Sequence, residues 1–71
     1  MTAFEQSLQN QALERAASVL EREAEAQREL ATRARDNDLE YLAEQLERDI
    51  DAWECAVRCV RSLIQYPQVI A

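Results

Sequence analysis

A single cluster of turn-forming residues, in a chain without glycine, limits this sequence to very few folds. The cluster is Arg35-Asp36-Asn37-Asp38, and the one proline follows far downstream at Pro67. Neither the segment before the cluster nor the segment between the cluster and Pro67 contains a residue that breaks a helix. The 71 residues therefore predict an all-α fold, an antiparallel two-helix hairpin in one domain, spanning residues 1–71.

The first helix is predicted over about residues 3–35. Thr2 and Glu5 have the spacing of a capping box, in which a hydroxyl and a carboxylate satisfy backbone amides at a helix start. Apolar residues then recur at spacings of three and four, and charged residues take the opposite side. The apolar residues are Leu8, Ala12, Leu13, Ala16, Ala17, Val19, Leu20, Ala24, Leu30, Ala31 and Ala34.

The second helix is predicted over about residues 39–65, ended by Pro67, with a short tail at 66–71. Its apolar residues follow alternating steps of four and three, which is the pattern of a helix-packing seam. They are Leu39, Ala43, Leu46, Ile50, Trp53, Val57, Val60 and Ile64.

The turn is predicted at residues 36–38. Asn37 either adopts the left-handed conformation that ends a helix, or caps the second helix with Glu40 as its reciprocal partner. Reversal near residue 37 predicts that Trp53 lies beside Leu20, Ala17 and Ala16, so that a large ring faces small side chains.

A second apolar arc on the second helix predicts a partner-binding surface. One neighbouring helix covers only one side of a helix, and small proteins rarely expose a large apolar patch without using it. The predicted surface combines this arc with two residues at the same end of the hairpin. Its residues are Phe4, Leu8, Ala52, Cys55, Ala56, Cys59, Leu63 and Tyr66. The occupant is either a second copy, giving a homodimeric four-helix bundle, or another protein.

Charge and hydropathy exclude several classes of function. Eight basic against fourteen acidic residues give a net charge of −6, which repels nucleic acid. The best apolar run, 55–64, is interrupted by Arg58 and Arg61, so no membrane span is expected. The first twenty residues lack the basic start and apolar centre of a signal peptide, so we expect a cytoplasmic protein with reduced thiols.

The sequence offers no catalytic residues and predicts no cofactor. Without histidine, no nucleophile, base and orienting group can be assembled, and the glutamates lack the histidines of a di-iron site. Cys55 and Cys59, one turn apart, cannot readily bridge each other within a helix. Two such pairs could form a four-thiolate zinc site across a dimer, but small buried hydrophobes are the preferred interpretation, and no metal is predicted.

Three short segments resemble one family of helical hairpins. They are the opening Met1-Thr2-Ala3-Phe4-Glu5 with Leu8, then Gln27-Arg28-Glu29-Leu30-Ala31, and Ser62-Leu63-Ile64. In these the chain is similar to the small co-chaperones of type III secretion systems, the YscE, PscE and SsaE group. The resemblance implies a protein that binds a larger helical-repeat chaperone and, with it, keeps the needle subunit unpolymerised. It implies no catalytic residues.

Two other functions fit a small acidic hairpin. One is a phage-type inhibitor or antiactivator that sequesters a host regulator. The other is a homodimeric RNA-binding bundle of the ROP type, which requires a basic face. Neighbouring genes would separate the first from a secretion co-chaperone, and an RNA titration at low salt would test the second.

Overall fold

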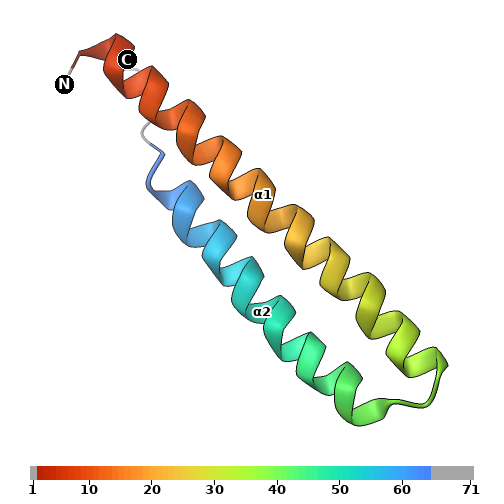
Figure 1. Cartoon of the computed structure of the whole chain (residues 1–71). Coiled ribbons are helices and arrows are strands. Elements are labelled where there is room, and N and C mark those ends of the chain that lie inside the picture. The colour runs from red at the N-terminus through yellow and green to blue at the C-terminus, as the bar shows by residue number, and fades with distance from the viewer. Residues whose placement is uncertain (1, 65–71) are drawn as a thin grey trace, which may run out of the picture.

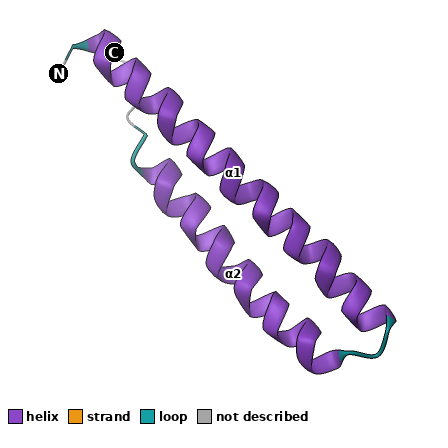
Figure 2. Cartoon of the chain, viewed as in Figure 1, coloured by secondary structure: helices purple, strands orange, loops and turns teal. Residues whose placement is uncertain are grey.

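The protein is an antiparallel hairpin of two long helices. The computed structural model describes residues 2–64, and Met1 and residues 65–71 lie outside the described part. Helix α1 spans Ala3–Asp36 and α2 spans Glu40–Ser62. They lie side by side along their lengths (Figure 1), and the described residues contain no strand (Figure 2). The molecule measures 54 × 21 × 16 Å, and the predicted all-α hairpin is confirmed.

Helix α1 begins at its predicted cap. Thr2 has an extended backbone, and its hydroxyl oxygen accepts a hydrogen bond from the Glu5 amide at 3.1 Å. The same hydroxyl donates to the Glu5 carboxylate, also at 3.1 Å. The carboxylate thus bonds to the hydroxyl, whereas in the predicted capping box it accepts from a backbone amide. The pair satisfies one of the free amides of the first turn.

The reversal uses residues 37–39, and here the prediction for Asn37 was wrong in both forms. Asn37 caps the end of α1 at φ −104°, and its side-chain amide donates to the Arg33 carbonyl at 2.7 Å. The left-handed residue is Asp38, at φ 60°. The Asp38 amide bonds to the Arg35 carbonyl at 3.0 Å, and the Leu39 amide bonds to the Ala34 carbonyl at 2.8 Å. This pair of bonds is a Schellman motif.

Helix α2 ends earlier than predicted. It stops at Ser62, whereas the sequence predicted a helix to about residue 65 ended by Pro67, which lies outside the described residues. The amides of Leu63 and Ile64 bond three residues back, both at 3.1 Å, which tightens the last turn. The Ser62 hydroxyl donates to the Cys59 carbonyl at 2.7 Å and so competes for a helical acceptor.

The core is a seam in which alanines of α1 face larger side chains of α2. On each helix the buried positions recur every seven residues. They are Ala17, Ala24 and Ala31 on α1, with Ala34 beside them, and Ala43, Ile50 and Val57 on α2, followed by Ile64 just beyond its end. Leu13, Leu20, Leu46, Trp53 and Val60 are half-buried along the same seam. Small residues on one helix allow the two backbones to approach closely.

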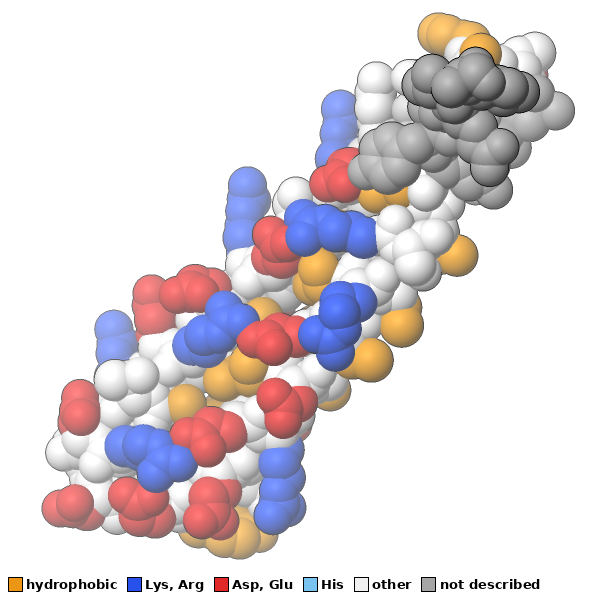
Figure 3. Space-filling model, turned by 180° about the vertical axis from the view of Figure 1, so that it is seen from behind, with side chains coloured by type: hydrophobic (Ala, Val, Ile, Leu, Met, Phe, Trp, Pro, Cys, Tyr) orange, Lys and Arg blue, Asp and Glu red, His pale blue; other side chains and the backbone are white. Residues whose placement is uncertain are grey.

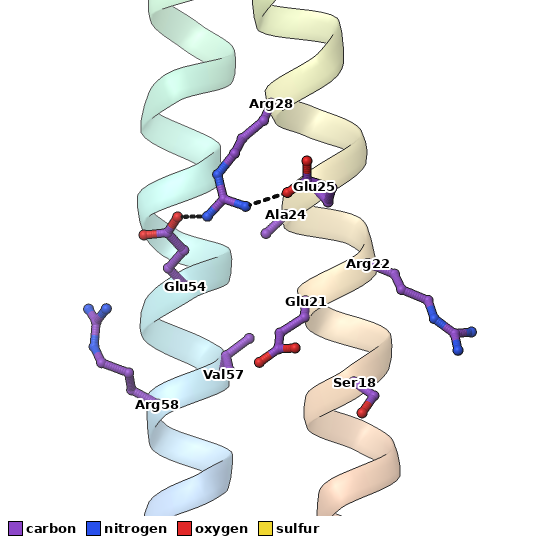
Figure 4. Close-up of a pocket in the computed structure, with 9 residues that line it drawn as sticks. All are labelled: Ser18, Glu21, Arg22, Ala24, Glu25, Arg28, Glu54, Val57 and Arg58. Atoms are coloured by element: carbon purple, nitrogen blue, oxygen red, sulfur yellow. Dashed lines mark hydrogen bonds and ion pairs between the residues drawn. The ribbon is translucent and has the colours of Figure 1, made fainter.

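The register differs from the sequence-based expectation by about one helical turn. Figure 4 shows Ala24 roughly level with Glu54, and Glu21 roughly level with Val57. Trp53 therefore lies nearer the level of Ala24 than that of Ala17. Part of the difference arises because the turn occupies 37–39 and is centred on Asp38, which moves each facing residue by two positions relative to a reversal at residue 37.

Candidate protein-docking surface

One side of the hairpin carries a row of ion pairs, which we call the ladder side. Its residues recur every seven positions on each helix. They are Glu14, Glu21, Arg28 and Arg35 on α1, and Glu40, Glu47, Glu54 and Arg61 on α2. Figure 3 shows acidic and basic side chains alternating along one face of the molecule, with hydrophobic side chains at its edge.

Three arginines hold this ladder together. Arg28 joins Glu54 of α2 to Glu25 of its own helix, the latter at 2.8 Å (Figure 4). Arg35 contacts Glu47 at 2.6 Å and Glu40 at 2.7 Å. Arg61 reaches back from α2 to Glu21 and, at 3.9 Å, to Glu14.

The ladder raises the pKa of two of its arginines but adds little stability. Hydrogen bonds to Glu54, and then to Glu25, raise the pKa of Arg28, and a hydrogen bond to Glu47 raises the pKa of Arg35. A raised arginine pKa contributes stability that is lost only as pH rises above about 12, so both groups stay charged at any ordinary pH. The pairs are solvent-exposed and therefore screened by salt.

The opposite side of the hairpin, which we call the apolar side, is covered by exposed aliphatic and small residues. Two columns with a seven-residue repeat face each other across the helices. They contain Ala16 and Leu30 on α1, and Leu42, the half-buried Ala56 and the C-cap residue Leu63 on the α2 side. Val19 and Ala26 extend the surface over α1, and Ala52 and Cys59 extend it over α2. Val19 is 62% exposed and Leu63 is 60% exposed.

A groove near the turn shows that the two columns lie on one side. Its volume is ≈ 280 Å³, and Leu30 of α1 and Leu42 of α2 both line it. Ala34, Leu39 and Leu46 form the rest of its apolar wall. Because each column repeats every seven residues, residues further along the columns face the same side as this groove.

Two carboxylates interrupt the apolar side. Glu23 lies between Ala16 and Leu30 in the α1 column and is half-buried. One of its oxygens accepts a hydrogen bond from the Gln27 amide at 3.1 Å. Asp49 lies between Leu42 and Ala56 in the α2 column and is exposed. Among the described residues, neither carboxylate takes part in an ion pair.

The structure places four of the predicted partner-binding residues on the apolar side. Ala56 and Leu63 lie in the α2 column, and Ala52 and Cys59 lie at its outer edge. Cys55 is exposed on the outer face of α2, away from α1. Tyr66 lies outside the described residues.

Phe4 and Leu8 do not join this surface. Leu8 is nine residues before the buried Ala17, a rotation of about half a turn, so it lies on the back of α1. Phe4 is also on that side and is 72% exposed. The two residues share an end of the hairpin with Leu63 (Figure 1) but face another direction.

The prediction that the two cysteines are buried was wrong. Cys55 and Cys59 are free thiols, and both are exposed, because the seam of α2 runs through the columns of Ile50 and Trp53 instead. Within residues 2–64 no three histidine, cysteine, aspartate or glutamate side chains gather as a metal site requires.

The α1 half of the apolar side was missing from the predicted site. The aliphatic residues Val19, Ala26 and Leu30 were visible as a flank of the first helix, but helical spacing alone did not say that this flank adjoins the arc of α2. The seven-residue recurrence of the ladder residues is the sequence signal that could have shown which flank of α1 adjoins the arc of α2. Two columns in which glutamates of one helix face arginines of the other mark one side of an antiparallel pair, so the mainly apolar columns belong to the other side.

Comparisons with known proteins add no family assignment. No family model, no curated protein and no solved structure matches this chain. Neither helix in the described part of the chain is long and apolar enough to span a bilayer.

Proposed function

We propose that this protein is a non-enzymatic protein-binding module that docks another protein on its apolar side. The observation that carries the proposal is the division of the hairpin into a ladder side, closed by its own ion pairs, and an apolar side with exposed aliphatic residues. Val19 and Leu63 are each more than half exposed in the free chain. Contiguous apolar surface of this kind on a small protein marks an interaction site.

In its particular form, the proposed function is that of a type III secretion co-chaperone in the bacterial cytoplasm. The resemblance to the YscE, PscE and SsaE group supports this form. A hairpin only 21 × 16 Å in cross-section is too thin to enclose a client alone. It is suited to cover an exposed end of a larger helical-repeat chaperone, because terminal repeats of such proteins need capping. The pair would then keep an amphipathic needle subunit from assembling.

Paired leucine substitutions test this function. The chain is co-expressed with a candidate helical-repeat chaperone, and the complex is purified through a tag on the chaperone. Leu63→Asp places a charge on the apolar side and should abolish co-purification. Leu8→Asp makes the same change on the back of α1, at the same end of the hairpin, and should leave it intact.

Circular dichroism of each variant checks that the hairpin remains helical, and Ala56→Asp provides a second disruption of the apolar side. Co-purification that survives both Leu63→Asp and Ala56→Asp would contradict the proposal. Loss of binding in Leu8→Asp alone would move the interface to the back of α1 and would equally contradict it.

A further inference from the structure

We propose that the occupant of the apolar side is an amphipathic helix from a different protein, with lysine or arginine at both borders of its apolar stripe. This inference rests on the proposed docking function and specifies the chemistry of the partner. It follows from the way the chain distributes its charges between the two sides of the hairpin.

The arginines are concentrated away from the apolar side. Arg28, Arg35 and Arg61 form the ladder. Arg22 and Arg58 lie at the outer borders of a second groove, between Glu21 and Glu54 on the ladder side, and their side chains point away from the seam (Figure 4). Near the apolar side, the groove at the turn is lined by Arg33, at one end of the surface. Arg15 is seven residues after Leu8, on the back of α1, and Arg48 is seven residues before Cys55, on the outer face of α2. Within the described residues, no arginine therefore lies in the Ala16–Leu30 column or the Leu42–Leu63 column that form the middle of the apolar side.

The carboxylates inside this surface need a cation from outside. Glu23 already has low exposure and has a neutral amide, Gln27, as its hydrogen-bonding partner at 3.1 Å. A docked apolar helix would remove more water from Glu23 and Asp49. Burying a carboxylate without a counter-charge costs free energy and so opposes binding. A partner that supplies a cation to each carboxylate avoids this cost.

The two carboxylates also suggest where the cations must be. Glu23 belongs to α1 and Asp49 to α2, so a helix lying along the groove between them has one carboxylate on each side. In the observed register the two residues are between one and two helical turns apart along the axis. The partner helix should therefore carry basic residues on opposite borders of its apolar stripe, offset by that interval.

A second copy of this chain is a poor occupant for the same reason. It would bring another Glu23 and another Asp49 to the interface, with Arg33 near the turn as the nearby cation. Two chains of net charge −6 would also repel each other at long range. Charge thus favours a basic partner over self-association.

Two synthetic peptides test the inference. Both are helical, with the same apolar stripe at three- and four-residue spacing, and they differ only in arginine or glutamate at the borders of the stripe. Binding of each labelled peptide to the full chain is measured by fluorescence anisotropy at two salt concentrations. The arginine peptide should bind at least roughly tenfold more tightly at low salt, and the difference should shrink as salt rises.

Two aspartates provide a matched pair of variants. Asp49→Asn and Asp51→Asn remove the same charge two residues apart, but Asp49 is on the apolar side, whereas Asp51 is in the same column as Arg58, towards the ladder side. Asp49→Asn should weaken binding of the arginine peptide by roughly threefold to tenfold, and Asp51→Asn should not. Glu23→Gln should act like Asp49→Asn.

The outcomes separate this inference from the proposed function. If both peptides bind equally and Ala56→Asp abolishes binding of both, the apolar side is a docking surface, as proposed. The inference that its partner is basic would then be wrong. Equal effects of Asp49→Asn and Asp51→Asn would mean that the chain prefers the arginine peptide only because of its net charge. That result would also overturn the inference. A chain that binds neither peptide, and that sediments as a dimer dissociated by Leu63→Asp, would show a second copy as the occupant and overturn the inference.

Discussion

Asp38 determines how the hairpin reverses. Its φ of 60° is in the left-handed region, where a β-carbon approaches the backbone closely and costs roughly 1–2 kcal/mol for most residues. Aspartate tolerates the region better than most, and glycine tolerates it without steric cost. In a chain with no glycine, this short polar residue supplies the turn that closes the Schellman motif.

Replacing Asp38 by glycine should therefore stabilise the protein. Asp38→Gly is expected to raise the free energy of unfolding by about 0.5–1 kcal/mol, because it relieves the left-handed backbone. Urea denaturation followed by circular dichroism measures the change. Asp36→Gly is the control, since it removes the same charge from the end of α1 at a helical position, and it should lower stability. Stabilisation by Asp36→Gly and not by Asp38→Gly would refute this account of the turn.

At the scale of the elements, the alanines of α1 set the distance between the helices. Ala17, Ala24 and Ala31 are buried at seven-residue intervals, opposite the larger residues of α2. A seam packed in this way has no space for a longer side chain on α1, because protein interiors are close-packed. Alanines two residues away from the seam are free of this constraint.

A pair of alanine substitutions tests this packing. Ala24→Leu inserts a large side chain into the seam and should lower the free energy of unfolding by about 1–3 kcal/mol. Ala26→Leu makes the same change at an exposed position and should alter it by less than about 0.5 kcal/mol. Thermal unfolding of both variants gives the comparison. Similar stability of the two would mean that the seam is not tightly packed.

The elements were more predictable than their contacts. The capping residue Thr2, the two helices and the seam residues from Ala43 onward could be predicted because each depends on spacing within a short segment, whereas Leu39, also predicted in the seam, is 51% exposed. The register was off by about a turn, in part because it depends on which residue of the reversal adopts the left-handed conformation, and both Asn37 and Asp38 can do so. The assignment of Phe4 and Leu8 to the surface failed because sharing an end of a hairpin does not fix the direction of a side chain.

On the scale of the whole molecule, the hairpin is two-sided. Ion pairs between the helices occupy one side, and exposed aliphatic residues with two carboxylates occupy the other. The ladder adds little to the free energy of unfolding, because exposed ion pairs contribute little. Its effect is to concentrate three arginines on one side, which leaves the apolar side as the surface suited to a basic, amphipathic partner.

Thiol footprinting of the complex tests the docking surface most directly. In a background with Cys55→Ser and Cys59→Ser, single cysteines are introduced by Ala56→Cys on the apolar side and Arg58→Cys on the ladder side, two residues apart on α2. Alkylation rates are measured with and without a saturating amount of the co-purifying chaperone. We expect alkylation at position 56 to slow at least roughly tenfold and alkylation at position 58 to remain unchanged. Equal protection at both positions, or protection at position 58 alone, would contradict the account.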